Sequence, residues 1–117
     1  MTVPSLRLLV MYTSRLPEVL AFYERLGLEF VPEQHGKGPV HYSANLNEFV
    51  LELYPAQAAN PECKLVRLGF SVENLDNVVR LLDTTETLSE PTRSSRGHRA
   101  IVKDPDGRVV ELYARSE

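Results

Sequence analysis

Val50-Leu51-Glu52-Leu53-Tyr54 and Val109-Val110-Glu111-Leu112-Tyr113 are two stretches that match at four of five positions. Glu111 follows Glu52 by 59 positions (111 − 52), which is close to half of the 117-residue chain. A repeat of this length predicts two copies of one structural unit. Chance likeness between two amphipathic segments is the alternative.

The same offset joins further residues without any gap. The pairs are Leu6 with Leu65, Leu9 with Leu68, Leu16 with Leu75, Val19 with Val78, Pro32 with Pro91 and Gly38 with Gly97. Because these matches keep one register across the whole unit, a true repeat is the favoured interpretation.

Each half has the same order of predicted elements. An apolar, strand-like run (6–12 and 65–72) leads into a segment with helical spacing (16–26 and 75–82). Three short strand candidates follow each helix, at 28–32, 40–46 and 49–54 in the first half and at 87–91, 99–103 and 108–114 in the second. Each unit therefore has the predicted order βαβββ.

Local signals support these boundaries. Ser14 and Asn74 are the expected helix caps, and Pro17 fits the first helical turn. Gly27 ends the first helix. Asp104-Pro105-Asp106-Gly107 is a strong turn signal, so its two aspartates are interpreted as structural.

We expect a single α+β domain over residues 1–117, with helices covering one face of the sheets. The first unit is expected at about 5–54, a linker at 55–63, and the second unit at about 64–114. The chain is long enough for one core but too short for two independent ones.

Composition excludes several functions. Thirteen Lys and Arg against sixteen Asp and Glu give a net charge of −3, and the densest basic stretch, 93–99, is interpreted as a loop, so no nucleic-acid partner is expected. No apolar run approaches the roughly 20 residues of a membrane span, and no signal peptide is evident. The single Cys63 permits no internal disulfide, which is typical of a cytoplasmic protein.

Taken together, the motifs resemble the glyoxalase, bleomycin-resistance and extradiol-dioxygenase superfamily, also called the vicinal oxygen chelate fold. The matching segments are 16–28 with its Phe22-Tyr23 pair, 51–53, the 70–75 entry into the second helix, and 104–107 running into Glu111-Leu112. The resemblance implies two units forming a curved eight-stranded cup with helices on its outer face. It also implies a small-molecule ligand and a homodimer.

In metal enzymes of this family, four ligand positions lie inside the cup, on the first and last strand of each unit. By resemblance they correspond here to Leu8, Glu52, Arg67 and Glu111. Leucine offers no donor atom, and a guanidinium repels a cation. Two neighbouring carboxylates need a compensating cation, which Arg67 can supply through a bidentate contact. The sequence therefore predicts a cup without a metal cofactor, with Arg67 paired to at least one of the two glutamates.

A rearranged metal site is the alternative. Counting back across the predicted turns places His41 opposite Glu52 and His98 opposite Tyr113, on the face that Glu111 shares. Local hydrogen bonding of each histidine is the simpler interpretation, and His35, in a Gly-rich loop, is taken as solvated. Tyr54 and Tyr113 lie two positions beyond the glutamates, so they either line the cup or pack in the core.

Three functions remain open at this point. The first is a metal-free protein that binds an antibiotic or another small molecule. The second is a metal-dependent lyase, isomerase or dioxygenase. The third is a metal-free enzyme that uses Glu52 or Glu111 as general base, with Arg67 holding an anionic substrate.

Overall fold

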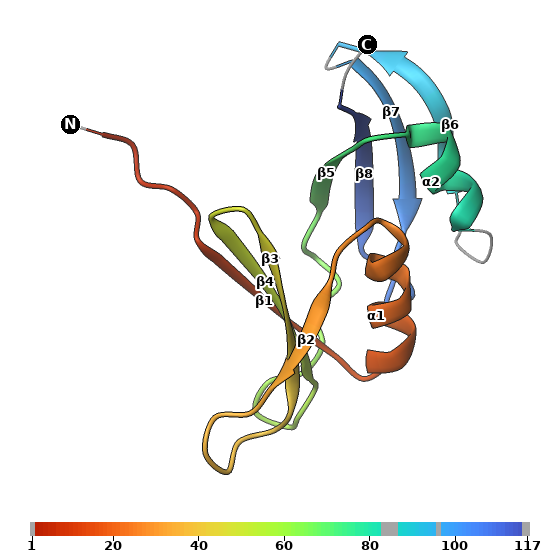
Figure 1. Ribbon diagram of the computed structural model, residues 1–117. Coiled ribbons are helices and arrows are strands. Elements are labelled where there is room, and N and C mark those ends of the chain that lie inside the picture. The colour runs from red at the N-terminus through yellow and green to blue at the C-terminus, as the bar shows by residue number, and fades with distance from the viewer. Residues whose placement is uncertain (1, 83–86, 96, 116–117) are drawn as a thin grey trace.

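The computed structural model describes residues 2–82, 87–95 and 97–115. Its elements follow the predicted order twice (Figure 1). In the first half they are β1 (Leu8–Thr13), α1 (Leu16–Arg25), β2 (Phe30–Glu33), β3 (His41–Leu46) and β4 (Phe49–Pro55). In the second half they are β5 (Leu68–Val72), α2 (Leu75–Leu81), β6 (Thr87–Ser94), β7 (Gly97–Lys103) and β8 (Val109–Ala114). None of the described helices is long and apolar enough to cross a membrane.

The eight strands form two open four-stranded mixed sheets, with orders β1-β4-β3-β2 and β5-β8-β7-β6. In each sheet the first strand pairs with the last in parallel, and the other pairs are antiparallel. Glu52 lies beside Val10 and Glu111 beside Gly69, so the two glutamates hold equivalent places. The structure confirms the α+β architecture and the repeated βαβββ order.

The helix ends follow from local chemistry, with one correction. Asn74 caps α2 as predicted, by accepting a hydrogen bond from the Asn77 backbone N–H at 3.1 Å. Ser14, in contrast, does not cap α1, because its hydroxyl donates to the Glu62 carboxylate. Thr13 Oγ1 lies at that end of α1 instead and accepts from the Arg15 N–H at 2.9 Å.

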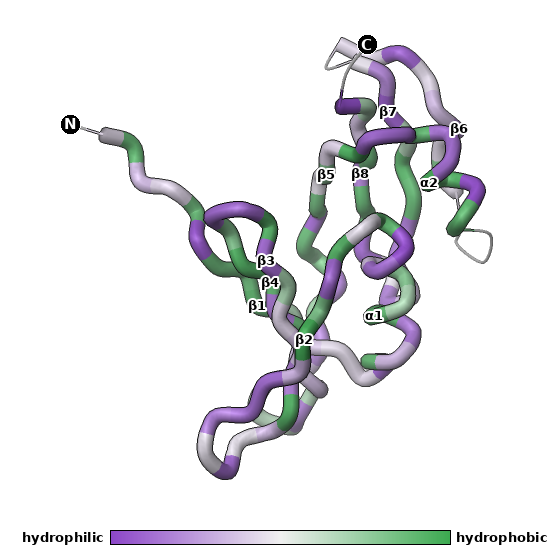
Figure 2. The backbone as a smooth tube through the Cα atoms, viewed as in Figure 1, coloured by the Kyte–Doolittle hydropathy of each residue, from purple (hydrophilic) through white to green (hydrophobic). Residues whose placement is uncertain are grey.

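One core lies between the helices and the faces of the two sheets that they cover. Its buried members include Met11, Val19, Phe22, Leu51, Leu53, Leu75, Val102, Val110 and Leu112. Helix α1 lies between the two sheets, where Tyr23 contacts the Phe70 ring of β5 at 6.0 Å between centroids (Figure 1). Figure 2 shows hydrophobic residues spaced along strands and helices, with hydrophilic ones gathered in the hairpin turns. The first half thus supplies part of the core of the second.

A fully buried arginine crosslinks the halves. Arg108 Nη1 donates to the carboxylates of Asp104 at 3.0 Å and Asp106 at 2.9 Å. Its Nε donates to the Cys63 carbonyl at 3.0 Å, and its Nη2 donates to the Tyr12 carbonyl at 2.8 Å. The guanidinium therefore holds the β7–β8 turn against β1 and the segment before β5, and both aspartates have a structural role.

Asp104 collects further donors in the same network. Its Oδ2 accepts from the Tyr23 hydroxyl at 2.7 Å, and its Oδ1 accepts from the backbone N–H groups of Asp106 at 2.9 Å and Arg108 at 3.0 Å. Burial raises the pKa of the Tyr23 hydroxyl well above its usual range, and the negative charge of Asp104 adds to this. The hydroxyl therefore stays protonated and remains a donor.

The β7–β8 loop is longer than predicted. Lys103 pairs with Val109, so residues 104–108 form a five-residue loop and Arg108 is not the start of β8. The basic stretch 93–99, predicted as a loop, instead belongs mostly to the β6–β7 hairpin: residues 93–94 lie in β6, residues 97–99 lie in β7, and Ser94 pairs with Gly97 across the turn that contains Ser95. Position 96 lies outside the described residues.

Candidate functional site

Each sheet has one face that the helices leave uncovered, and we name these the first face and the second face. Strand alternation and the observed registers assign their residues. The first face carries Leu8, Val10, Tyr12, His41, Ser43, Val50, Glu52 and Tyr54. The second face carries Arg67, Gly69, Ser71, Arg99, Ile101, Val109, Glu111 and Tyr113. All site residues expected from the sequence lie on these faces except His98.

A charged cluster centred on Glu111 occupies the second face. Glu111 Oε2 accepts from Arg67 Nε at 2.7 Å. Its Oε1 accepts from Arg99 Nη1 at 2.5 Å and from the Tyr113 hydroxyl at 2.5 Å. The predicted pairing of Arg67 with a glutamate is therefore confirmed, and both carboxylate oxygens are occupied.

These contacts stabilise the ionised form of Glu111. The Tyr113 hydroxyl and the Arg67 guanidinium lower the pKa of the carboxyl to about 2, with Arg99 contributing in the same direction and partial burial opposing them. A carboxylate with so low a pKa is a weak base. Glu111 is therefore suited to holding charge in place and unsuited to accepting a proton near neutral pH.

Arg99 lies in this cluster at the place where His98 was expected from the sequence. The prediction that His98 lies opposite Tyr113 is wrong, because it assumed a four-residue loop. The five-residue loop pairs Arg99 with Tyr113, and a shift of one residue moves His98 to the helix-covered face of the sheet. His98 therefore contributes nothing to a site around Glu111.

The first face carries a row of aromatic rings. Tyr12 and Tyr54 have centroids 5.5 Å apart, and the His41 ring stacks on Tyr54 at 4.0 Å with an interplanar angle of 6°. Burial raises the pKa of Tyr54, and the charge of Glu52 adds to the effect. Tyr54 is therefore neutral at ordinary pH and offers a flat surface.

His41 is two residues away from its predicted place. The β3–β4 turn consists of Asn47 and Glu48, and the register places Ser43 beside Glu52. His41 shares the face of Glu52, as expected, but it lies against Tyr54 instead. The sequence signal for the β3–β4 turn covered four residues. It did not determine which two of them form the loop between the paired strands.

The metal-ligand positions of the family do not form a metal site in this chain. Leu8 offers no donor atom and its side chain is about half exposed. Arg67 brings a positive charge to Glu111, and both Glu111 oxygens already accept hydrogen bonds. Glu52 lies on the other sheet and makes no hydrogen bond or ion pair with the described part of the chain. The residues at these four positions therefore do not fit the metal that the family implies.

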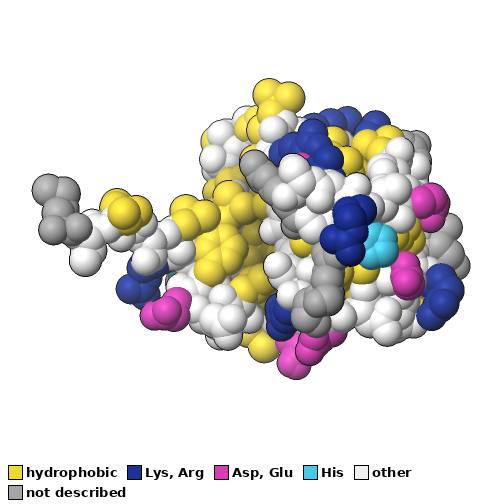
Figure 3. Space-filling model, turned by 90° about the horizontal axis from the view of Figure 1, so that it is seen from above, with side chains coloured by type: hydrophobic (Ala, Val, Ile, Leu, Met, Phe, Trp, Pro, Cys, Tyr) yellow, Lys and Arg dark blue, Asp and Glu magenta, His cyan; other side chains and the backbone are white. Residues whose placement is uncertain are grey.

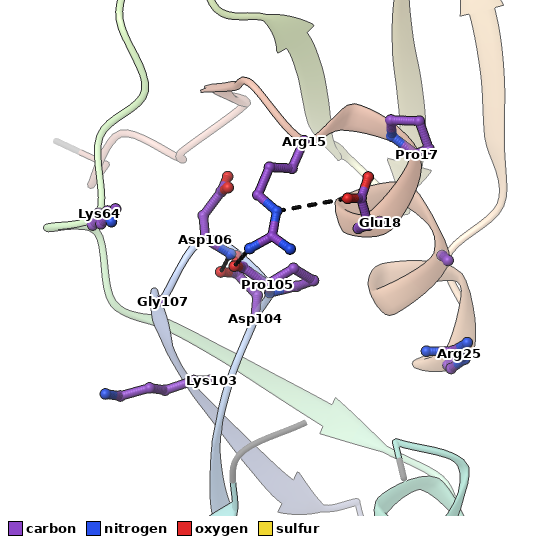
Figure 4. Close-up of a pocket in the computed structure, with 11 residues that line it drawn as sticks. Arg15, Pro17, Glu18, Arg25, Lys64, Lys103, Asp104, Pro105, Asp106 and Gly107 are labelled. Carbon is purple, nitrogen blue, oxygen red and sulfur yellow. Dashed lines mark hydrogen bonds and ion pairs between the residues drawn. The ribbon is translucent and has the colours of Figure 1, made fainter. Parts of the chain in front are cut away.

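One groove lies away from both faces. It has a volume of about 860 Å³ and runs between α1 and the β7–β8 turn (Figure 4). Arg15 reaches across it from the start of α1 and donates to the Pro105 carbonyl at 2.9 Å. A second groove of about 430 Å³ runs between the end of α1, the β3–β4 turn and β5. Neither groove is lined by Glu52 or Glu111.

The comparisons with known proteins agree with the fold described above. Residues 5–112 match the Glyoxalase/Bleomycin resistance protein/Dioxygenase superfamily, and the chain belongs to that superfamily. No curated protein sequence matches the chain.

Solved structures with the same fold come from proteins described with different roles. TnmS3, an antibiotic binding protein from Streptomyces sp. CB03234, is 22% identical, with a TM-score of 0.76 over 99% of each chain. Lactoylglutathione lyase from Agrobacterium tumefaciens is 18% identical, with a TM-score of 0.66 over 96% of this chain and 94% of that one. A glyoxalase/bleomycin resistance protein/dioxygenase family enzyme from Burkholderia phytofirmans PsJN is 15% identical, with a TM-score of 0.71 over 93% of this chain and 97% of that one. At these identities the likeness concerns the fold alone.

The charged cluster predicts a pH dependence. Because the folded-state pKa of Glu111 is lowered to about 2 from an ordinary value of 4.5, its contribution to stability is complete above pH 4.5 and is lost as the pH falls toward 2. Replacing Arg67 with alanine removes one donor, so the pKa of Glu111 is expected to rise. Titration of the Glu111 carboxyl by carbon NMR measures this directly. The control Arg80→Ala, at an exposed position of α2, should leave the titration unchanged. An unaltered pKa of Glu111 in Arg67→Ala would contradict the cluster.

Proposed function

We propose that this protein binds a small molecule that carries a planar aromatic part and an anionic group, without a metal ion at the four ligand positions of the family. The observation that carries the proposal is the Arg67–Glu111–Arg99 cluster, in which a fixed positive charge stands where the family's enzymes hold an ion. The fold of the antibiotic binding protein TnmS3 supports a binding function.

The charge balance favours an anionic partner. Two guanidiniums surround one carboxylate, so the cluster has a net positive charge. The Arg67 side chain is 56% exposed and keeps guanidinium surface facing solvent. Arginine binds carboxylate and phosphate groups through paired N–H donors, which suits it to hold the anionic group of a ligand.

The aromatic row supplies the second half of the proposed site. A flat ring can pack against Tyr54 or Tyr12, which already make a stacked contact with His41 and a tilted contact with each other, respectively. Glu52, which has no partner among the described residues, remains available to accept a hydrogen bond from the ligand.

The two faces belong to different sheets, and a homodimer is proposed to bring them together. Strands β1 and β5 each lie at the edge of their sheet, so each has one side without a neighbouring strand. Leu6 (72% exposed) and Leu65 (92% exposed) hold equivalent positions before these strands, and Figure 3 shows hydrophobic side chains gathered beside the N-terminal segment. A twofold pair that covers these edges would place a first face opposite the partner's second face.

The dimer has its own test. Sedimentation velocity at micromolar concentrations is expected to give twice the 13.2 kDa chain mass. Charged replacements at both apolar positions, Leu6→Asp with Leu65→Asp, are expected to shift the protein toward monomers because a buried unpaired charge is costly. A wild-type protein that sediments as a monomer throughout this range would contradict the assembly.

An enzyme with a glutamate base is the second candidate. The low pKa of Glu111 counts against that residue, which leaves Glu52 as the carboxylate for such a role. A metal-dependent enzyme at the family's positions is disfavoured by the residues themselves, since Leu8 offers no donor atom and Arg67 offers only a positive charge.

Calorimetry tests the binding proposal. A panel of planar aromatic carboxylates and their uncharged methyl esters is titrated into wild type, Arg67→Ala and Tyr54→Ala. We expect the acids to bind, the esters to bind at least tenfold more weakly, and each variant to lose about tenfold or more in affinity, as the loss of a charge-assisted hydrogen bond or a stacking partner predicts. Arg80→Ala is the matched control and should bind as wild type does. Equal affinity for acids and esters would overturn the anionic part of the proposal.

A further inference from the structure

A second cluster lies at the loop end of the β2–β3 hairpin and involves none of the family's metal positions. Glu33 and His41 face each other across the two strands, and His35 follows Glu33 by two residues. Glu33 Oε1 lies 3.3 Å from His41 Nε2 and 3.9 Å from His35 Nε2. The potential ligand atoms of all three side chains lie within 4.8 Å of one another.

His41 is buried in an orientation that leaves one nitrogen unsatisfied. Its side chain is 1% exposed, and Nδ1 lies 3.2 Å from the Pro39 carbonyl oxygen, to which it can donate. Nε2 then carries a lone pair directed toward the cluster, and this buried atom makes no hydrogen bond with the described residues. An unpaired buried lone pair beside a carboxylate is unfavourable unless a cation lies between them.

The arrangement around His41 is typical of a metal ligand. Histidines that bind metals usually donate their other ring N–H to a backbone carbonyl or a carboxylate, which fixes the ring and the tautomer. Here the Pro39 carbonyl is in that place, and the stacked Tyr54 ring holds the imidazole plane. His41 is therefore positioned before any ion binds.

We propose that Glu33, His35 and His41 bind one divalent transition-metal ion of the zinc type. Two imidazoles and one carboxylate suit zinc, whereas calcium and magnesium require oxygen ligands. Bonds of about 2.0–2.1 Å in a tetrahedron place ligand atoms about 3.3 Å apart. The Glu33–His41 distance already has this value, and His35, which is 75% exposed, can rotate to close the remaining distance.

The proposed ion would retain one coordination position for water or an exogenous ligand, as three-ligand zinc sites do. Because His41 stacks on Tyr54, the proposed site adjoins the aromatic row of the first face. The proposal does not depend on the anion-binding half of the site proposed above, since none of its three residues belongs to the Glu111 cluster; it shares with the aromatic half only the contact between His41 and Tyr54.

Calorimetric titration of zinc chloride into chelator-treated protein without an affinity tag tests the site. We expect one ion per chain. His35→Ala and Glu33→Gln alter exposed or half-exposed side chains, so they should fold normally while weakening zinc affinity by about tenfold or more, as expected for the loss of a ligand. The NMR resonance of His41 Nε2 should shift on zinc addition.

Two controls exclude competing donors. His98→Ala removes the remaining histidine, and Cys63→Ser removes the exposed thiol. Both should bind zinc as wild type does. The proposal is overturned if less than about a fifth of an equivalent binds, if His35→Ala and Glu33→Gln bind like wild type, or if affinity depends on Cys63. A His41 Nε2 resonance that changes with pH but not with zinc would assign the cluster to an ion pair alone.

Discussion

Replacing Arg108 with methionine is expected to lower the free energy of unfolding by about 3–5 kcal/mol, the usual effect of removing one partner from a buried ion pair. The guanidinium is fully buried and compensates two carboxylates, those of Asp104 and Asp106. Methionine fills a similar volume but leaves both charges without a partner. Since a domain of this size is stable by about 5–15 kcal/mol, the loss is a large fraction of the total.

Urea unfolding followed by far-UV circular dichroism measures this effect. Arg80→Met is the matched control, because Arg80 is an exposed arginine of α2 whose hydrogen-bond partner within the described part of the chain is Asn77, and its replacement should change stability by no more than about 0.5 kcal/mol. Adding Asp104→Asn and Asp106→Asn to Arg108→Met should restore part of the lost stability by neutralising the buried carboxylates. If Arg108→Met unfolds at the wild-type urea concentration, the ion-pair network does not stabilise the fold as argued.

This network also explains which part of the site the sequence could not predict. The turn residues Asp104 to Gly107 indicated a turn, but loop length depends on whether the next residue joins the strand. Arg108 is held out of the ladder because its side chain pairs with both aspartates and its N–H donates to Asp104. The resulting five-residue loop brings Arg99 to Glu111 and moves His98 to the other face. The β7–β8 register therefore depends on the burial of one arginine by residues distant in the sequence, and local sequence signals do not encode it.

The repeat, in contrast, was predictable from local sequence patterns. Alternating apolar residues specify which strand face is covered, and the helical spacing of 16–26 specifies α1. The Arg67–Glu111 pairing was expected from the resemblance to the family, whose metal-ligand positions correspond to these two residues, and not from local patterns. The Glu33–His35–His41 cluster was missed because His35 was interpreted as solvated; a hairpin register centred on Lys37 would have placed Glu33 opposite His41.

Tyr23 connects the two halves, and its replacement is the second large effect expected. The ring is fully buried in the core, where it contacts Phe22 at 4.9 Å and Phe70 of the second sheet at 6.0 Å. Tyr23→Ala removes these contacts and is expected to cost about 3–5 kcal/mol. Tyr23→Phe keeps the ring and removes only the donor to Asp104, which should cost about 1–3 kcal/mol by leaving a buried carboxylate less satisfied.

The difference between these two variants separates packing from hydrogen bonding. In a double-mutant cycle, Tyr23→Phe combined with Asp104→Asn should cost less than the two single changes added together, because both remove the same hydrogen bond. Because α1 of the first half packs against β5 of the second, the Tyr23→Ala protein should still unfold in a single transition when followed by circular dichroism. Two separate transitions would contradict a shared core, since they would mean that each βαβββ unit retains its structure without the side chain that joins them.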